Sequence, residues 1–152
     1  MKNKFGFILV KPQIGENIGA CARSLKNFGF SELRIVSPKQ SWPNNKAKAT
    51  SVGAYDIIRK AKIYNNTFDA ISDFNIVISL SARKRDINKK HISINQFLEM
   101  IKLKTNIRFG LMFGPEASGL SNDDLSLSNF VLKIPTSKKF KSLNLSHSLT
   151  II

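Results

Sequence analysis

Short apolar runs alternate with segments of helical periodicity along the 152-residue chain. The runs lie at residues 5–10, 33–36, 75–80, 107–113 and 130–134. Continuous apolar runs of this length are typical of strands that are buried on both faces of a sheet. Because strands and helices alternate, the sequence predicts an α/β fold in which helices cover both faces of a mostly parallel sheet.

The segments between the runs carry helix signals. Ile18, Ala22 and Leu25 recur at helical spacing, and Gly29 follows them as a stop signal. Residues 51–61 have an apolar pattern that predicts a further helix.

Four polar side chains are predicted to cap helices. They are Asn17, Thr67, Ser93 and Ser121. Thr67 would begin a short helix through Phe74, and Ser93 would begin a helix over residues 94–102. Carboxylates follow Ser121, and they favour the first turn of a helix through its dipole.

Length and composition limit the class of protein. A chain of this length is expected to form one domain over residues 1–152. No apolar run approaches the roughly 20 residues that a bilayer span needs, so we expect a cytoplasmic protein without membrane contact. Cys21, the single cysteine, is expected to be a small core residue. The two histidines have no metal-ligand spacing, so no metal is expected.

The net charge of +14 results from 24 Lys and Arg against 10 Asp and Glu. Such an excess favours a polyanionic partner because basic side chains neutralise phosphates. The predicted RNA-binding cations form two clusters, Arg83, Lys84 and Arg85, and Lys138, Lys139 and Lys141. A biased composition or a solvated face would give the same charge, and this alternative stays open.

The segment 109–120 reads FGLMFGPEASGL, an apolar run followed by a turn in which Gly114 and Gly119 lie on either side of Glu116. The run is expected to be a buried strand with the turn at its carboxyl end. Ligands bind at that end of the strands in open α/β sheets, and glycines let a ligand approach the backbone closely. An ordinary strand and turn is the alternative.

Two further motifs also lie where a strand ends and a helix begins. NIGACAR occupies residues 17–23, and IPTSKKFKSLNL occupies residues 134–145. In this order the three motifs resemble those of the SPOUT superfamily of RNA methyltransferases, and the match is closest to the TrmH/TrmJ type of tRNA 2′-O-ribose methyltransferase. The stretch SARKR at residues 81–85 is also similar to that subgroup.

This resemblance implies a trefoil knot in the C-terminal part of the fold and a site for S-adenosyl-L-methionine within it. The residues that it implies for cofactor binding are Ser79, Leu80, Ser81, Gly114, Gly119, Ile134, Lys141, Ser142 and Leu143. The sequence contains neither G-x-G-x-x-G nor a P-loop motif, which argues against a dinucleotide or nucleoside-triphosphate enzyme.

The resemblance also implies catalytic roles for Arg23, Glu116, Ser142, Asn144 and Asn17. Methyl transfer to a ribose needs the 2′-OH in line with the methyl carbon and a route for its proton. Because a guanidinium stays protonated, Arg23 would bind the adjacent phosphate and stabilise developing charge. Glu116 would orient Arg23 or a ribose hydroxyl. The ordinary alternatives are a surface cation for Arg23, a solvated carboxylate for Glu116, and capping of the last helix for Ser142 and Asn144.

Together these features predict an RNA 2′-O-methyltransferase that acts on cytidine or uridine 32 in a tRNA anticodon loop. The family packs its final helix across a two-fold axis, so we expect a homodimer that covers Leu145, Leu149 and Ile152. That helix stops at the last residue without a cap, so we expect it to be truncated. The alternatives are a ribosomal RNA 2′-O-methyltransferase, a SPOUT-fold RNA-binding protein without activity, and a basic nucleotide-binding protein unrelated to RNA.

Overall fold

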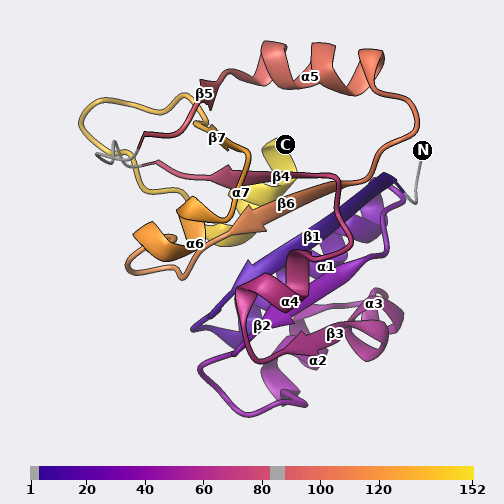
Figure 1. Cartoon of the computed structure of the whole chain (residues 1–152). Helices are drawn as coiled ribbons and strands as arrows, with labels where there is room; N and C mark the ends of the chain where they lie inside the picture. The colour runs from indigo at the N-terminus through magenta and orange to yellow at the C-terminus, as the bar shows by residue number, and fades with distance from the viewer. Residues whose placement is uncertain (1–3, 83–87) are drawn as a thin grey trace.

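Seven strands form one sheet in the described part of the chain, and every pairing between them is parallel (Figure 1). A computed structural model describes residues 4–82 and 88–152. The strands are β1 (Phe5–Val10), β2 (Leu33–Val36), β3 (Lys62–Tyr64), β4 (Ile76–Leu80), β5 (His91–Ile92), β6 (Phe109–Phe113) and β7 (Phe130–Leu132). Their order is β3-β2-β1-β6-β4-β7-β5, so β6 is central and β4 and β7 follow it on one side.

Helices cover both faces of this sheet, which confirms the predicted α/β architecture (Figure 1). One face carries α1 (Gly15–Asn27), α2 (Asn45–Thr50), α3 (Tyr55–Lys60), α5 (Ile94–Leu103) and α7 (Leu145–Ile151), and the other carries α4 (Thr67–Ile71) and α6 (Asn122–Ser126). None of the described helices has the length and apolar character that a bilayer crossing requires. The trefoil knot stays a prediction that rests on the resemblance.

Alternate residues of β1 point to opposite faces and contribute to two apolar clusters. Phe5, Phe7 and Leu9 join the cluster under α1, whereas Ile8 and Val10 join the cluster under α4 and α6. All five are buried. Burial on both faces explains why this run has no polar alternation.

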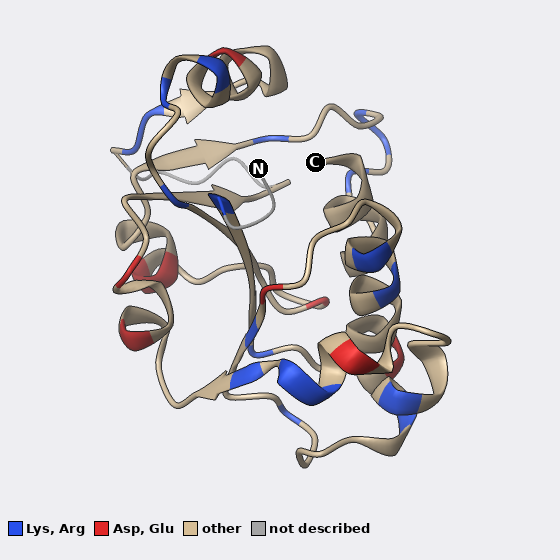
Figure 2. Ribbon diagram, turned by 90° about the vertical axis from the view of Figure 1, so that its right-hand side faces the viewer, with Lys and Arg blue, Asp and Glu red and all other residues tan. Residues whose placement is uncertain are grey.

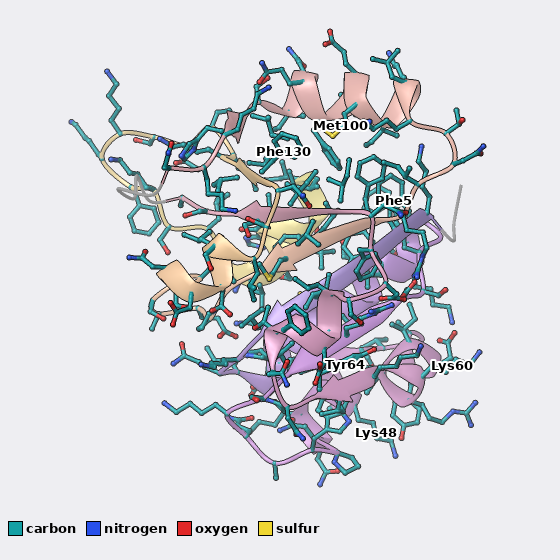
Figure 3. All side chains as sticks on the ribbon, viewed as in Figure 1. Phe5, Lys48, Lys60, Tyr64, Met100 and Phe130 are labelled. Carbon is teal, nitrogen blue, oxygen red and sulfur yellow. The ribbon has the colours of Figure 1, made fainter. Side chains whose placement is uncertain are left out.

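Aromatic rings connect α5 to the sheet. Phe97 packs edge-on against Phe109 with ring centroids 5.9 Å apart, and Phe109 stacks on Phe5 at 5.5 Å. Met100 and Phe130 are half-buried against the same cluster. Figure 3 shows both side chains between α5 and the strands, where they anchor this helix to the sheet.

Two of the predicted caps are confirmed and two are wrong. Ser93 and Ser121 cap α5 and α6, each in a capping box with the residue three positions later. Asn17 is not a cap, because α1 begins earlier, with Ile14 at the N-cap position. Asn66 caps α4 in place of Thr67, since its side chain accepts the N–H of Asp69 at 2.9 Å. That helix ends at residue 71, before the predicted residue 74.

The helix predicted over residues 51–61 is shorter in the structure, where α3 covers Tyr55–Lys60. Residues 51–54 instead form the turn that follows α2, and this turn contains Gly53 at a φ of 75°. A residue in the left-handed region ends a helix, and glycine adopts that conformation without steric cost.

An aromatic ring rests on two glycines at the amino-terminal end of the sheet. Gly6 of β1 pairs with Gly110 of β6, and a Cβ on them would come within 2.2 Å and 2.8 Å, respectively, of Phe74 ring atoms. The guanidinium groups of Arg34 and Arg108 lie over the same ring, 4.3 Å and 4.8 Å from its centroid. Both glycines are therefore required by packing.

The two guanidinium groups share the carboxylates of Glu32 and Asp73. Arg34, only 2% exposed, binds both acids, and Arg108 binds both at 2.6 Å. Burial alone would lower the pKa of Arg34, but the hydrogen bonds to Asp73 and Glu32 outweigh it and raise that pKa. The bond from Arg34, and then that from Arg108, hold the pKa of Asp73 well below its usual range.

Candidate functional site

Three loops meet at the carboxyl end of the sheet and enclose a pocket of about 600 Å³. The loops follow β4, β6 and β7, which are neighbours in the sheet, so their parallel order brings the loops together. Leu145 and Ser148 of α7 complete the wall. The second and third sequence motifs therefore line one pocket.

Eight of the nine residues predicted to bind a cofactor line this pocket. They are Leu80, Ser81, Gly114, Gly119, Ile134, Lys141, Ser142 and Leu143. The ninth, Ser79, lies inside β4 with a fully buried side chain. Its Oγ has no hydrogen-bond partner among the described residues. The side chain of Ser79 is therefore enclosed within the sheet and does not line the pocket.

The two glycines of the second motif have different roles. A Cβ on Gly114 would lie 2.2 Å from the backbone nitrogen of Leu120, so this glycine lets the loop fold back on itself. Gly119 has a φ of 68°, and a Cβ there would meet no atom within 4 Å. Gly119 therefore supplies a left-handed conformation beside open space.

The carboxylate of Glu116 binds the amino end of α1. Its Oε2 accepts the N–H of Gln13 at 2.7 Å, and its Oε1 accepts the N–H of Ile14 at 3.2 Å and Nδ2 of Asn17 at 3.0 Å. In return, Gln13 Oε1 accepts the N–H of Ala117 at 2.9 Å. No side chain at the N-cap position caps α1. A carboxylate stabilises a helix at this end by satisfying N–H groups and complementing the dipole.

Asn17 continues this network to the third motif. Its Oδ1 accepts Nδ2 of Asn144 at 3.0 Å, and Oδ1 of Asn144 accepts the N–H of Ser146 at 2.9 Å. Asn144 thus caps α7, as one sequence interpretation expected. These bonds join Glu116, Asn17 and Asn144, and Ser142 lines the adjacent pocket together with Glu116. Four of the five predicted catalytic residues therefore lie close together.

Arg23, the fifth, lies apart from them. It is exposed on α1 and is not among the residues that line the pocket. No hydrogen bond or ion pair joins it to another described residue, and the described bonds of Glu116 go to the start of α1. A single chain therefore does not bring Arg23 to the pocket.

Basic residues lie on the helices of one face of the sheet, and the helices of the other face carry only acidic ones among their charged residues (Figure 2). The helices α1, α2 and α3 each carry Lys or Arg, whereas α4 and α6 carry only acidic residues among their charged ones. Lys138, Lys139 and Lys141 are exposed on the loop after β7, which we call the basic loop (residues 135–143). The other predicted cluster, residues 83–85 (Arg83, Lys84 and Arg85), lies outside the described residues.

Two contacts of residues outside the three motifs were also not predicted from the sequence. Gln13 holds the Glu116 loop, and Ser24 Oγ lies 2.7 Å from Thr150 Oγ1, which joins α1 to α7. The partners are 104 and 126 residues apart, so no local pattern signals either contact. Cys21 of α1 is fully buried, and desolvation, with a smaller contribution from Glu116, raises the pKa of its thiol.

Comparison with known proteins agrees with this geometry. The chain is 41% identical to the tRNA (cytidine-2′-O-)-methyltransferase TrmJ of Methanocaldococcus jannaschii over 95% of its length. It is 32% identical to the tRNA (cytidine/uridine/adenosine-2′-O-)-methyltransferase TrmJ of Pseudomonas aeruginosa over its whole length. The chain spans 64% and 60% of these two relatives, respectively.

Solved structures share the fold. TrmJ from Z. mobilis ZM4 superposes with a TM-score of 0.90 at 35% identity, covering 96% of this chain and 65% of that one. The SpoU methyltransferase AviRb from Streptomyces viridochromogenes, solved in complex with AdoMet, superposes with a TM-score of 0.76 at 17% identity, covering 99% of this chain and 56% of that one. The match to the SpoU rRNA Methylase family extends over residues 4–152. The chain therefore belongs to the SpoU rRNA methylase family.

Proposed function

We propose that this chain transfers a methyl group from S-adenosyl-L-methionine to a ribose 2′-OH of tRNA, at cytidine or uridine 32 of the anticodon loop. The observation that carries the proposal is the pocket at the carboxyl end of the sheet, built from two motif loops of an RNA methylase family. The names of the TrmJ relatives support tRNA as the substrate; both name cytidine, and the second also names uridine and adenosine. Position 32 rests on the resemblance.

The pocket fits the cofactor in size and in chemistry. A volume of about 600 Å³ lies within the range of small-molecule sites. Leu80, Ile134 and Leu143 provide apolar walls for an adenine ring, and the loop backbones provide hydrogen-bonding groups. The open space beside Gly119 lets a ligand approach that backbone. When bound, the cofactor supplies an electrophilic methyl group, and these residues hold it in place.

Arg23 acts on the substrate from the second subunit of a homodimer. In one chain it is exposed away from the pocket, and the resemblance implies that both subunits build each site. Its guanidinium binds the phosphate beside the target ribose and stabilises the charge that develops on the 2′-oxygen.

The surface for this dimer differs from the one expected from the sequence. The expectation that Leu145 and Leu149 need a partner chain is wrong, because both are buried against α1 within one chain. The contact between Ser24 and Thr150 brings together the ends of α1 and α7. Phe28 and Ile151 lie there, 62% and 50% exposed, and offer an apolar surface. Light scattering should give twice the 17.0 kDa of one chain, and a monomer at micromolar concentration would contradict the dimer.

Mass spectrometry of ribose-methylated nucleosides tests the activity. Purified protein is incubated with S-adenosyl-L-methionine and either tRNA or ribosomal RNA. We expect 2′-O-methylcytidine or 2′-O-methyluridine from tRNA alone. Product from ribosomal RNA alone would favour the alternative that the family name suggests. Cofactor binding by calorimetry without product from either RNA would identify an RNA-binding protein that has lost the reaction.

A further inference from the structure

A second hollow, of about 690 Å³, lies beside the cofactor pocket. The two share a wall, because Glu116, Thr136 and Ser142 line both. Residues that line the second hollow but not the first include Ile14 at the start of α1 and Phe140 of the basic loop. A ligand seated in it would therefore lie next to the proposed cofactor.

Phe140 is 76% exposed, the largest exposed fraction among the described aromatic side chains. Exposure alone means little, since single apolar side chains are common on protein surfaces. Phe140 differs because it lines a hollow and is flanked in sequence by three lysines. Aromatic faces stack on nucleobases, and neighbouring lysines neutralise the phosphates of the same strand.

We propose that Phe140 is a base-stacking residue that seats the target nucleotide of the RNA in the second hollow, with the ribose toward the cofactor pocket. This inference rests on the proposed function. Bases in a single-stranded loop can be splayed out at little cost and stacked on aromatic side chains. The lysines of the basic loop hold the flanking phosphates.

Charge favours RNA over other occupants of the hollow. The lysines of the basic loop flank Phe140, and the carboxylate of Glu116 is already bonded to α1. A second copy inserted into this hollow, as distinct from one packed at the ends of α1 and α7, would bring its own lysines toward these. A polyanion instead gains from them.

Binding of an anticodon stem-loop RNA, followed by fluorescence anisotropy, tests the stacking. Phe140→Ala should weaken binding about 5- to 150-fold, the range for the loss of one stacked base. Phe140→Leu should lose nearly as much, because it keeps the apolar volume without the ring, and Phe140→Tyr should bind like the wild type. The matched control is Phe68→Ala, since Phe68 is 66% exposed on α4 and should not matter. Cofactor affinity, measured by calorimetry, should not change in any variant.

A stem-loop with an abasic residue at position 32 isolates the target base. With this RNA, wild type and Phe140→Ala should bind equally, because the stacking partner is gone. An equal penalty on both RNAs, a wild-type affinity of Phe140→Leu, or a change from dimer to monomer in Phe140→Ala would overturn the proposal. A wild type that binds but transfers no methyl group would refute the proposed function alone, and the abasic comparison would still decide the role of Phe140.

Discussion

Replacing Glu116 by alanine should destabilise the whole fold, although Glu116 lies in a loop. Its carboxylate accepts the N–H groups of Gln13 and Ile14 and the side chain of Asn17, and no N-cap side chain replaces it. Alanine leaves these donors to water alone. Because the Glu116 carboxylate stabilises α1, and α1 packs against α2 and α7, its removal should lower the stability of the whole domain and not only that of the loop.

The size of the effect follows from the three bonds. Loss of a helix cap costs about 0.5–2 kcal/mol, and one net hydrogen bond is worth about 0.5–1.5 kcal/mol. The groups are half-buried or exposed, so water restores part of the loss. We expect a loss of about 2 kcal/mol, which lowers the unfolding midpoint by about 4–8 °C in a chain of this length. Glu116→Gln keeps one acceptor oxygen and should lose about half as much.

Thermal unfolding followed by circular dichroism measures this difference. The matched control is Glu99→Ala, because Glu99 is an exposed carboxylate on α5, where a substitution should change stability by less than about 0.5 kcal/mol. Equal midpoints for Glu116→Ala and Glu99→Ala would refute the reasoning. A double-mutant cycle with Asn17→Ala should be non-additive, because the two side chains share a bond.

Three further results are expected. In a single turnover at saturating tRNA, Arg23→Ala should slow methyl transfer at least about a hundredfold with cofactor affinity unchanged, whereas a near wild-type rate would remove Arg23 from the catalytic residues. RNA affinity should fall steeply with salt, by roughly 0.7–0.9 in the logarithmic slope for each phosphate contact, and a flat dependence would show that the charge is only compositional. Asp73→Asn should lower the free energy of unfolding at pH 7. The pKa of Asp73 is depressed in the folded state, so its contribution is complete above the unfolded pKa of about 3.9 and is lost as pH falls through the lower folded pKa. Urea titrations should therefore show the difference shrinking below about pH 4, and a constant difference would contradict this cause.

Much of the fold could be predicted because the sequence carries strong local signals. β1 and β2 have the predicted bounds, since a run buried on both faces is apolar throughout. Ser93 and Ser121 could be identified as caps from residues within the same turn. A pocket at the carboxyl end of the sheet could be predicted because the loops that follow neighbouring parallel strands gather at one edge.

The remaining features depend on contacts between distant residues. β3 and β5 have three and two residues and lie at the edges of the sheet, so no apolar run marks them. The burial of Leu145 and Leu149 depends on α1, which the pattern of α7 alone does not reveal. The role of Glu116 at the start of α1 could not be predicted, because its partners are 99 to 103 residues away.

The bonds from Asn17 to Glu116 and Asn144 set an order of events during synthesis. Asn17 leaves the ribosome 99 residues before Glu116 and 127 residues before Asn144. At roughly 5–20 residues per second, the start of α1 waits about 6–25 s for its last partner. An incomplete nascent chain therefore exposes its lysines and arginines before it can form the site. Because the loop that follows β7 lines the pocket, the chain can complete this pocket only when the third motif has been made.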